Sequence, residues 1–443
     1  MKGKIRKKKV SKKKDYDFNG SLGKEEFLFV FVLVFFIVIV SGLVLLGDYF
    51  SSYADGVMAS PRIRSATLVG PAMGVTPVSK TPIYVYSGSN NIYTGFPPLV
   101  YGYCLDPDCN GIKNSLNLLP PGQYPHIEKG TDGLALISWA GNNLLADGGL
   151  KLIKCLDLEC SNYNLQVIEP EASPIVAHDL VVGSDGIPFI IYVEIKQGIG
   201  SDVKMYRCSD VSCSSGVGHT FLSSTGVWDG YVGDFFNVVL KSDGNPFFAV
   251  LKNNLGVGPQ ATTVSCQDKL CLQTIDSTIS ESEWGIGVST VIGGDGFPSI
   301  TYNNFYDGKL YFSHCLDVDC IQKEPSMVLS GVGGGNNMRM ILNAQGYPLI
   351  SYFKWTGGNI GDQVITNCYD YSCSNSKTNT FYGDASSFVT LGHNNLPLVA
   401  LYSWTGPNLA FKILNCKDYA CNSFSESSEI ISPYSINLIE MAR

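Results

Sequence analysis

Charged residues are scarce in this 443-residue chain: Asp, Glu, Lys and Arg together make up 16%, whereas apolar residues make up 45%. Such a composition excludes an intrinsically disordered chain, which needs low hydrophobicity and high charge, and a coiled coil, which needs many charged helix formers. The chain holds 47 Gly and 21 Pro, which indicates many turns. We therefore expect a globular protein that is long enough to bury a large core.

Basic residues are missing from the part of the chain that would have to bind phosphates. Residues 1–26 hold ten of the 31 Lys and Arg and four of the 39 Asp and Glu, so the rest of the chain carries a net charge of −14. Nucleic-acid binding requires clustered Lys and Arg. We therefore expect no nucleic-acid partner.

Motifs of well-known enzyme classes are also missing. The chain has no Walker loop, no His-Glu-x-x-His sequence and no motif of a nucleophilic triad, and it has only five histidines. We predict no cofactor and no bound metal. Paired carboxylates for glycoside hydrolysis remain open, because spacing along the chain does not reveal which acids meet. Catalysis is thus undecided, and a non-enzymatic role is favoured.

One long apolar run stands near the N-terminus. Phe27 to Leu46 contains no charged residue, and twenty such residues can cross a bilayer as a helix. The basic tail, residues 1–26, should stay in the cytoplasm, with residues 47–75 as an extracellular linker and residues 76–443 outside. A cleaved signal peptide is the alternative, because Ser52-Tyr53-Ala54 resembles a cleavage site, although its apolar region is usually shorter. The sequence predicts a single-pass protein of the cytoplasmic membrane.

No cysteine is left over: the fourteen cysteines form seven Cys-x-Asp-x-x-Cys pairs. The pairs are Cys104/Cys109, Cys155/Cys160, Cys208/Cys213, Cys266/Cys271, Cys315/Cys320, Cys368/Cys373 and Cys416/Cys421. The even count and the location outside the membrane predict seven hairpin disulfides. Zinc is the rival, but a Cys₄ site needs two pairs to meet. We interpret the Asp of each pair as a turn-stabilising residue rather than a calcium ligand.

The cysteine pairs recur about every fifty residues, which is typical of a repeat architecture. Five repeats also carry a proline 17 to 20 residues before the first Cys, as in Gly-Asp-Gly-Phe-Pro298. Asp-Gly predicts a tight turn between strand a and strand b, the proline begins strand b, and the Cys pair joins strand c to strand d. Seven such units predict an all-β, seven-bladed β-propeller. The C-terminal residues 432–443 should supply the innermost strand of the first blade and so close the ring.

Loop lengths vary on only one predicted face of the propeller. This face carries the loops that join strand b to strand c and the loops that join strand d to strand a of the next blade. Functional loops usually vary on a rigid scaffold. All five tryptophans map to this face. Two occur in similar settings, Trp355-Thr-Gly-Gly-Asn359 and Trp404-Thr-Gly-Pro-Asn408, where an indole beside an amide suits a sugar or a peptide. The candidates are Trp228, Trp284, Trp355, Asn359, Trp404 and Asn408. Packing between blades is the alternative, and it is favoured for Trp139.

A second candidate site is a polar ring near the start of strand a, at the mouth of the central channel. The positions nine residues before each proline equivalent are occupied by His126, Asp179, Asn237, Ser289, Arg339 and Phe388, and His178 adjoins Asp179. Polar groups at a channel mouth are a common form of ligand site. A hydrated channel without a ligand is the alternative. His126, His178 and Asp179 could also share a metal.

The Asp-Gly-x-Pro-x-Ile-x-Tyr hairpins and Leu-Lys-x-x-x-Cys strands resemble the repeats of secreted or membrane-anchored prokaryotic β-propellers, whose blades are similar to those of sialidases. The sialidase Asp-box is absent, and the propeller offers only Arg207 and Arg339 before the terminal Arg443, too few for the sialidase arginine triad. The resemblance implies a cell-surface binding or scaffold role. We thus predict a binding or adhesion module for a surface polysaccharide, glycoprotein or partner protein. A polysaccharide hydrolase or lyase, and a structural subunit of a surface complex, are the alternatives.

Overall fold

The computed structural model describes residues 81–442, with several loop segments excepted. The excepted segments are 89–97, 122, 141–148, 170–174, 197–199, 224–229, 233–236, 255–257, 280–286, 305–306, 332–333, 358–359, 382–384, 393, 406–407, 428–429 and 433–435. The predicted tail, membrane span and linker lie outside the described residues. Among the residues that are described, no helix is long and apolar enough to cross a bilayer.

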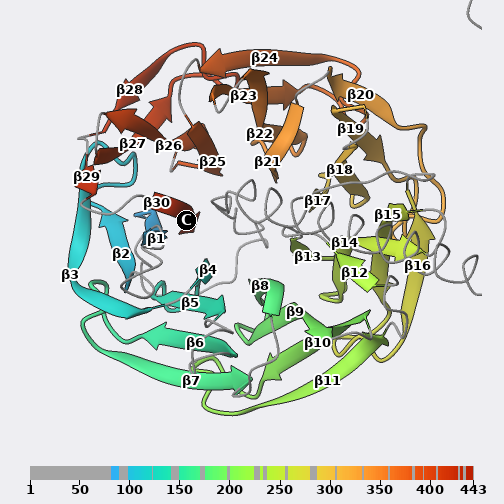
Figure 1. Cartoon of the computed structure of the whole chain (residues 1–443), viewed down its shortest axis with the longest axis horizontal. Coiled ribbons are helices and arrows are strands. Elements are labelled where there is room, and N and C mark those ends of the chain that lie inside the picture. Colours follow the sequence, from blue (N-terminus) through green and yellow to red (C-terminus); the bar gives the residue numbers. More distant parts are fainter. Residues whose placement is uncertain are drawn as a thin grey trace, which may run out of the picture. The chain divides into compact units, whose positions relative to one another are not determined.

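The described strands form seven antiparallel sheets, each a blade of the predicted propeller (Figure 1). From the innermost strand outward, blade 1 contains β30 (Ile436–Ala442), β1 (Ile83–Gly88), β2 (Pro98–Cys104) and β3 (Ile112–Pro121). Blade 2 contains β4 (Gln123–Lys129), β5 (Ala135–Ala140), β6 (Leu150–Cys155) and β7 (Tyr163–Glu169). Blade 3 contains β8 (Ile175–Val182), β9 (Pro188–Lys196), β10 (Gly200–Cys208) and β11 (Gly216–Ser223).

The remaining blades repeat this order, with an interrupted inner strand in blade 4 and an interrupted outer strand in blade 7. Blade 4 contains β12 (Gly230–Val232) and β13 (Val238–Leu240), then β14 (Pro246–Asn254), β15 (Gly258–Cys266) and β16 (Thr274–Thr278). Blade 5 contains β17 (Val288–Ile292), β18 (Pro298–Asn304), β19 (Lys309–His314) and β20 (Met327–Ser330). Blade 6 contains β21 (Gly334–Leu342), β22 (Pro348–Gly357), β23 (Ile360–Cys368) and β24 (Ser376–Phe381). Blade 7 contains β25 (Ala385–Leu391), β26 (Pro397–Thr405), β27 (Asn408–Cys416), β28 (Phe424–Glu426) and β29 (Ile430–Ser432).

Chain from both ends closes the ring, as predicted. Strand β30 pairs with β1, so that Ala442 lies opposite Ile83. The innermost strands contact one another in sequence around the centre, and β25 of blade 7 meets β30 of blade 1. In blade 1, Ile83 and Ala442 therefore stand where the other blades have a turn between strand a and strand b.

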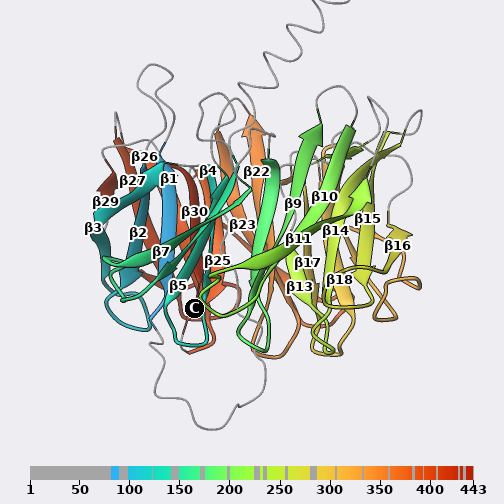
Figure 2. The same cartoon turned by 90° about the horizontal axis from the view of Figure 1, so that it is seen from below.

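Two faces of the ring can be distinguished in the edge-on view of Figure 2, because the strands run from one face to the other. Strand b starts beside the end of strand c: Phe189 pairs with Arg207, the residue before Cys208. The turns between a and b and the seven Cys turns thus share one face, which we call the disulfide face. The hairpins between b and c lie on the opposite face, the hairpin face.

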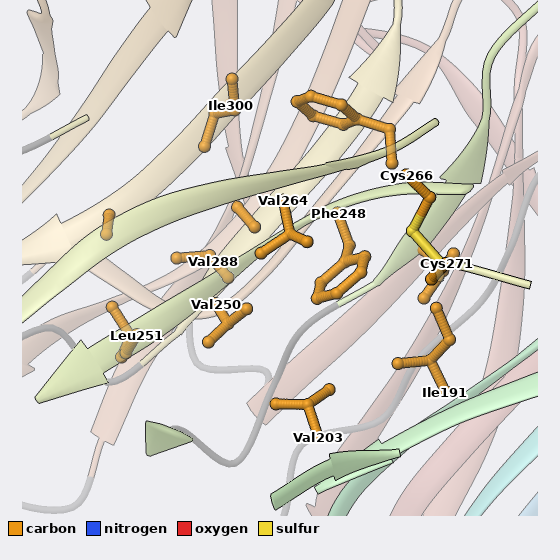
Figure 3. Packing of buried hydrophobic residues seen from close by; sticks show 14 of the residues in the cluster. Ile191, Val203, Phe248, Val250, Leu251, Val264, Cys266, Cys271, Val288 and Ile300 are labelled. Carbon is orange, nitrogen blue, oxygen red and sulfur yellow. A yellow bond between two sulfur atoms is a disulfide. The ribbon is translucent and has the colours of Figure 1, made fainter. Parts of the chain in front are cut away.

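The hydrophobic core lies between neighbouring blades. Strand b is buried on both sides, and every residue of β18 is buried. Figure 3 shows the cluster that joins blades 3, 4 and 5, in which Phe248 and Val264 of blade 4 lie between Val203 of blade 3 and Ile300 of blade 5. Side chains of successive strand residues point to opposite sheet faces, so each central strand packs on two neighbours.

All seven predicted disulfides are present, one in each blade, and all fourteen cysteines are buried. The bonds join Cys104 to Cys109, Cys155 to Cys160, Cys208 to Cys213, Cys266 to Cys271, Cys315 to Cys320, Cys368 to Cys373, and Cys416 to Cys421. No cysteine is free, so the cysteines act as structural bridges within each turn. The prediction of hairpin disulfides is confirmed, and the zinc alternative is wrong.

The backbone at the second cysteine of each pair is a feature that the sequence did not indicate. This residue has a left-handed conformation in every turn, where glycine is the usual choice. The φ values are 55° at Cys109, 51° at Cys160, 54° at Cys213, 51° at Cys271, 57° at Cys320, 56° at Cys373 and 53° at Cys421. Because the disulfide requires a side chain at this position, glycine cannot replace the cysteine there.

The Asp of each Cys turn accepts N–H bonds from residues further along the turn. Asp317, for example, accepts from the backbone of Asp319, Ile321 and Gln322. A carboxylate in this position satisfies donors that the tight turn leaves without strand partners. The carboxylates therefore stabilise the turns locally, as predicted.

In several junctions a Cys turn also braces strand c of the preceding blade. The donors are Tyr103, Ser265 and Asn415, each of which precedes the first Cys of its own blade. They donate to Glu159 Oε1 (3.0 Å), Asp319 Oδ1 (2.5 Å) and the Asp108 carbonyl (2.8 Å), respectively. The last of these bonds joins blade 7 to blade 1 and supports ring closure on the disulfide face.

Candidate functional site

The predicted polar ring lies on the innermost strands, at mid-strand in three blades and at the start of a strand in two. His126, Asp179 and Arg339 each sit in the middle of β4, β8 and β21, and Ser289 is the second residue of β17. All are buried, as is Asn237, which directly precedes β13. Asp179 is three residues from the disulfide-face end of β8. The proline spacing determined which residues are equivalent, but not where strand a begins.

Three junctions between blades share one hydrogen bond at this ring. In each junction, the side chain of one blade's ring residue accepts a hydrogen bond from a backbone N–H group of the next blade. The donor is the residue directly after the ring residue of that next blade. These bonds run from Val238 to Asp179 Oδ2 (2.5 Å), from Thr290 to Asn237 Oδ1 (2.7 Å) and from Met340 to Ser289 Oγ (3.0 Å). An innermost strand is a sheet edge, whose N–H groups need partners when they are buried. The ring side chains supply those partners.

The structure brings together the two histidines and the aspartate that the sequence placed in adjacent blades. His126 Nδ1 lies 2.9 Å from Asp179 Oδ1, and the His126 and His178 rings stand 4.4 Å apart. Asp179 therefore joins blade 2 to blade 4 through one carboxylate. Among the described residues, no group of three His, Cys, Asp or Glu side chains is arranged to hold a metal ion. The shared-metal interpretation of this trio is therefore not supported.

These contacts give the ring a structural role between blades. His126, His178 and Asp179 are each at most 2% exposed, so a ligand could reach them only if the inner strands moved. Asn237 binds the backbone of Thr290 through both its amide nitrogen (2.8 Å) and its amide oxygen. Ligand binding by His126, His178, Asp179, Asn237 and Arg339 stays a prediction.

On the hairpin face, two of the predicted tryptophans occupy equivalent backbone positions. Trp355 lies near the end of β22 opposite Gly361, and Trp404 lies near the end of β26 opposite Leu409. Blades 6 and 7 are neighbours, with β22 against β25. Asn408 begins β27. Trp228, Trp284 and Asn359 lie outside the described residues.

Trp139 differs from the other tryptophans because it is fully buried. It packs with Ile83, Tyr101 and Ile153 between blades 1 and 2. In blades 3, 5 and 6 the equivalent residue of strand b is a buried tyrosine. The packing interpretation of Trp139 is thus confirmed.

Blade 3 carries several charged residues near its hairpin-face end. At its hairpin-face end, Lys196 Nζ lies 2.6 Å from Asp202 Oδ1, and Lys204 pairs with Glu194 and with Glu169 at 3.8 Å. Within blade 3 the two lysines and the two acids Asp202 and Glu194 neutralise one another, and Glu169 adds a contact from blade 2. Burial raises the pKa of nearby Tyr192 above its ordinary value, so the phenol stays protonated. Its hydroxyl donates a hydrogen bond to Glu169 Oε2 at 3.0 Å. This network holds strands together and offers few open groups to a ligand.

One arrangement that sequence reasoning missed resembles a catalytic triad. In blade 5, Ser299 Oγ lies 2.9 Å from His314 Nδ1, and His314 Nε2 lies 3.0 Å from Asp295 Oδ2. A nucleophile must be reachable by substrate, yet Ser299 is fully buried. The geometry therefore favours a structural contact over catalysis.

The same contact recurs in other blades with other residues. The residue before the first Cys pairs with the Asp of the turn between a and b: Lys154 with Asp132, and Arg207 with Asp185, both at 2.7 Å. Burial alone would raise the pKa of Asp185, but the Ile187 N–H and the Arg207 guanidinium outweigh it and hold the pKa below its ordinary value. His314 and Asp295 are the version of this brace in blade 5. The sequence contained the signal for this brace, because its two positions recur in the repeats. They are the residue before the first Cys and the Asp of the turn between strand a and strand b.

Comparisons with known proteins bear on the fold. No family model matches the chain, and no curated protein matches it. A periplasmic gluconolactonase from Pseudomonas aeruginosa is similar in structure, with a TM-score of 0.57, 9% identity, and coverage of 82% of this chain and 99% of that one. A putative 6-phosphogluconolactonase from Bacteroides fragilis gives a TM-score of 0.54 at 8% identity and covers 84% and 100% of the two chains. A Hadza microbial sialidase gives 0.43 at 9% identity, with 75% and 73% covered.

Identities this low show a shared fold and nothing of activity. The resemblance to β-propeller repeat proteins is confirmed: the chain is a seven-bladed propeller of four-stranded antiparallel blades. Its seven disulfides indicate an extracellular or otherwise oxidising environment.

Proposed function

We propose that this protein is a cell-surface binding module that holds a polysaccharide, a glycoprotein or a partner protein on its hairpin face. The observation that carries the proposal is the equivalent placement of Trp355 and Trp404, at the ends of β22 and β26 in neighbouring blades. Two aromatic residues repeated from blade to blade can bind successive units of one extended ligand.

The residues around these tryptophans support a glycan or peptide ligand. Each hairpin adds an asparagine, Asn359 or Asn408, and neither hairpin carries an acid between its Trp and its Asn. An indole covers the apolar C–H surface of a sugar, while an amide both donates and accepts hydrogen bonds. The self-neutralised hairpin of blade 3 lacks this combination.

A fluorescence titration tests the proposal. The full-length protein is titrated with envelope polysaccharide fragments, and the Trp355→Ala/Trp404→Ala double variant is titrated in parallel. We expect saturable quenching in the natural protein and its loss in the double variant. The matched control is Ile195→Ala, which changes the equivalent residue of the blade 3 hairpin and should leave the titration unchanged.

Other outcomes would point to other functions. If chromatography showed that the glycan was cleaved, the protein would be a hydrolase or lyase. If no glycan caused quenching and another membrane protein co-purified stably, the glycan proposal would fail and a structural subunit would replace it. Quenching that persisted in the double variant would move the site away from blades 6 and 7.

A further inference from the structure

Blade 5 differs from the other blades in its outermost strand. Strand d begins three residues after the second Cys in the six other blades, for example at Thr274 after Cys271. In blade 5, Lys323 forms only an isolated bridge with Cys315, and β20 begins at Met327. Pro325 causes the delay, because proline has no N–H to donate to strand c.

The interrupted segment is nevertheless held in place. The Glu324 N–H donates to the His314 carbonyl at 2.8 Å, and Ser313 Oγ donates to the Glu324 carbonyl at 3.1 Å. Residues 324–326 therefore form an ordered bulge at the edge of the blade. Bulges of this kind often redirect side chains at a site.

A cavity of about 300 Å³ opens at this bulge, between blades 5 and 6. Its walls come from the bulge, from β19 and from the Cys turn of blade 6. The lining residues are Phe312, His314, Glu324, Pro325, Met327, Ser372 and Ser374. Such a volume accommodates one long side chain or a small molecule.

The polar groups of the cavity are mainly acceptors. Ser372 and Ser374 donate their hydroxyl protons to Asp370, at 2.8 and 3.0 Å, which leaves their oxygens to accept. His314 already uses one ring nitrogen toward Ser299 and the other toward Asp295. Another part of the cavity wall is apolar, with Phe312 buried and Met327 packed beside it.

The Glu324 carboxylate adds a negative charge, and none of the described ion pairs neutralises it. The described ion pairs of blade 5 join His314 to Asp295, Lys309 to Asp307 and Asp319 to Lys241 of blade 4, and none of them includes Glu324. The adjacent Lys323 instead lies 3.4 Å from Ser277 Oγ of blade 4. A carboxylate, two acceptor hydroxyls and an apolar wall together match a cation on an apolar stem.

We propose that the cavity at the Pro325 bulge binds a lysine or arginine side chain of a protein partner. The apolar stem packs on Pro325 and Met327 at the cavity wall, and the charged end faces Glu324 and the two serine hydroxyls. The acidic body of the protein, at −14 outside residues 1–26, adds long-range attraction for a basic partner. This site lies apart from the hairpin face, so it is independent of the glycan proposal.

Calorimetric titration of the full-length protein with two matched peptides tests this inference. One peptide is acetyl-glycyl-arginyl-glycine amide, and the other replaces arginine with the uncharged citrulline, which has nearly the same shape. We expect the arginine peptide to bind about tenfold more tightly than the citrulline peptide, because only the cation pairs with the carboxylate. Raising the salt concentration should weaken the arginine peptide alone.

Glu324→Gln tests the residue assignment, because it removes the charge and keeps the shape. Binding of the arginine peptide should weaken about tenfold. The control is Glu426→Gln, which removes one negative charge from the outer strand of blade 7, where Glu426 pairs with Lys412 at 3.3 Å. Equal binding of both peptides, no binding of either, or equal losses in both variants would each overturn the proposal. Unfolding curves check that both variants remain folded.

Discussion

The two faces of the propeller are built from the same seven blades, yet they are constructed differently. On the disulfide face, every blade repeats the same Cys turn, with one carboxylate that accepts several N–H groups and one left-handed Cys. On the hairpin face, blade 3 pairs its charges internally, whereas blades 6 and 7 have Trp355 and Trp404 at equivalent backbone positions. One face is thus constrained by local bonds, and the other is free to vary its side chains, which is where ligand recognition can evolve without loss of the fold.

The largest expected difference between regions comes from the same substitution at two tryptophans. Trp139→Ala removes a fully buried ring from the core between blades 1 and 2, and should lower the free energy of unfolding by about 4 kcal/mol. Trp404→Ala on the hairpin face should lower it by less than about 1 kcal/mol if the ring serves a ligand. Urea unfolding curves measure both. Equal losses would show that Trp404 is a core residue.

A smaller effect is expected at the junction of blades 4 and 5 on the disulfide face. Asp319 accepts from Ser265 Oγ at 2.5 Å and lies 3.3 Å from Lys241 Nζ, which is buried. Asp319→Ala should cost about 3 kcal/mol, because the buried ammonium group loses its nearest carboxylate and keeps only Ser265 Oγ at 2.9 Å and Asp243 at 4.0 Å. The control is Lys412→Ala, which breaks the more exposed Lys412 pair with Glu426 and should cost less than about 1 kcal/mol. Similar costs would contradict a bracing role for the Cys turn.

Each disulfide should contribute about the same amount, since every pair closes a loop of the same length. Changing Cys266 and Cys271 together to Ala should lower the free energy of unfolding by about 2 kcal/mol on the chain-entropy estimate. The same change at Cys368 and Cys373 should give the same loss within error. Mass spectrometry without reduction should find no free thiol in the natural protein. Fourteen free thiols would refute the disulfide account.

The smallest effect is a dependence of stability on acid pH that arises on the disulfide face. Burial alone would raise the pKa values of Asp157, Asp370 and Asp418, but hydrogen bonds from the turn backbone and from Ser and Asn side chains, Ser372 first in the case of Asp370, outweigh it and lower them. Because these carboxyls titrate lower in the folded chain, their contribution is complete above their ordinary pKa of 3.8 and is lost as pH falls below it. Thermal unfolding between about pH 2 and 7 should show Tm falling below about pH 4. Asp370→Asn should flatten part of that fall.

Much of the fold could be predicted because it is encoded by local residues that repeat. Each Asp-Gly turn, each strand-initiating proline and each Cys pair depends on residues within a few positions of one another. Pro188 and Pro298, for example, begin β9 and β18 as the sequence predicted. The strand order within a blade then follows from short hairpin connections.

The candidate sites were harder to predict because they depend on direction and on neighbours. The sequence placed His126, His178 and Asp179 in adjacent blades, but it could not show that the Asp179 carboxylate binds His126 and the Val238 N–H together. It also could not show that Pro325 opens a cavity against the Cys turn of the next blade. Such contacts form across some fifty residues of chain, between side chains whose directions depend on the twist and packing of two sheets.

The sequence alone therefore determined the blade count, the disulfide pairing and the closure of the ring by both chain ends, because each follows from a local motif and its period. Only the tertiary structure decided that Trp139 is core, that Ser299, His314 and Asp295 form a brace, and that side chains of the polar ring join neighbouring blades. These outcomes depend on how far a side chain is buried and on which groups of the next blade it meets. Periodicity determines which residues are equivalent, whereas packing between sheets determines what each of them contacts.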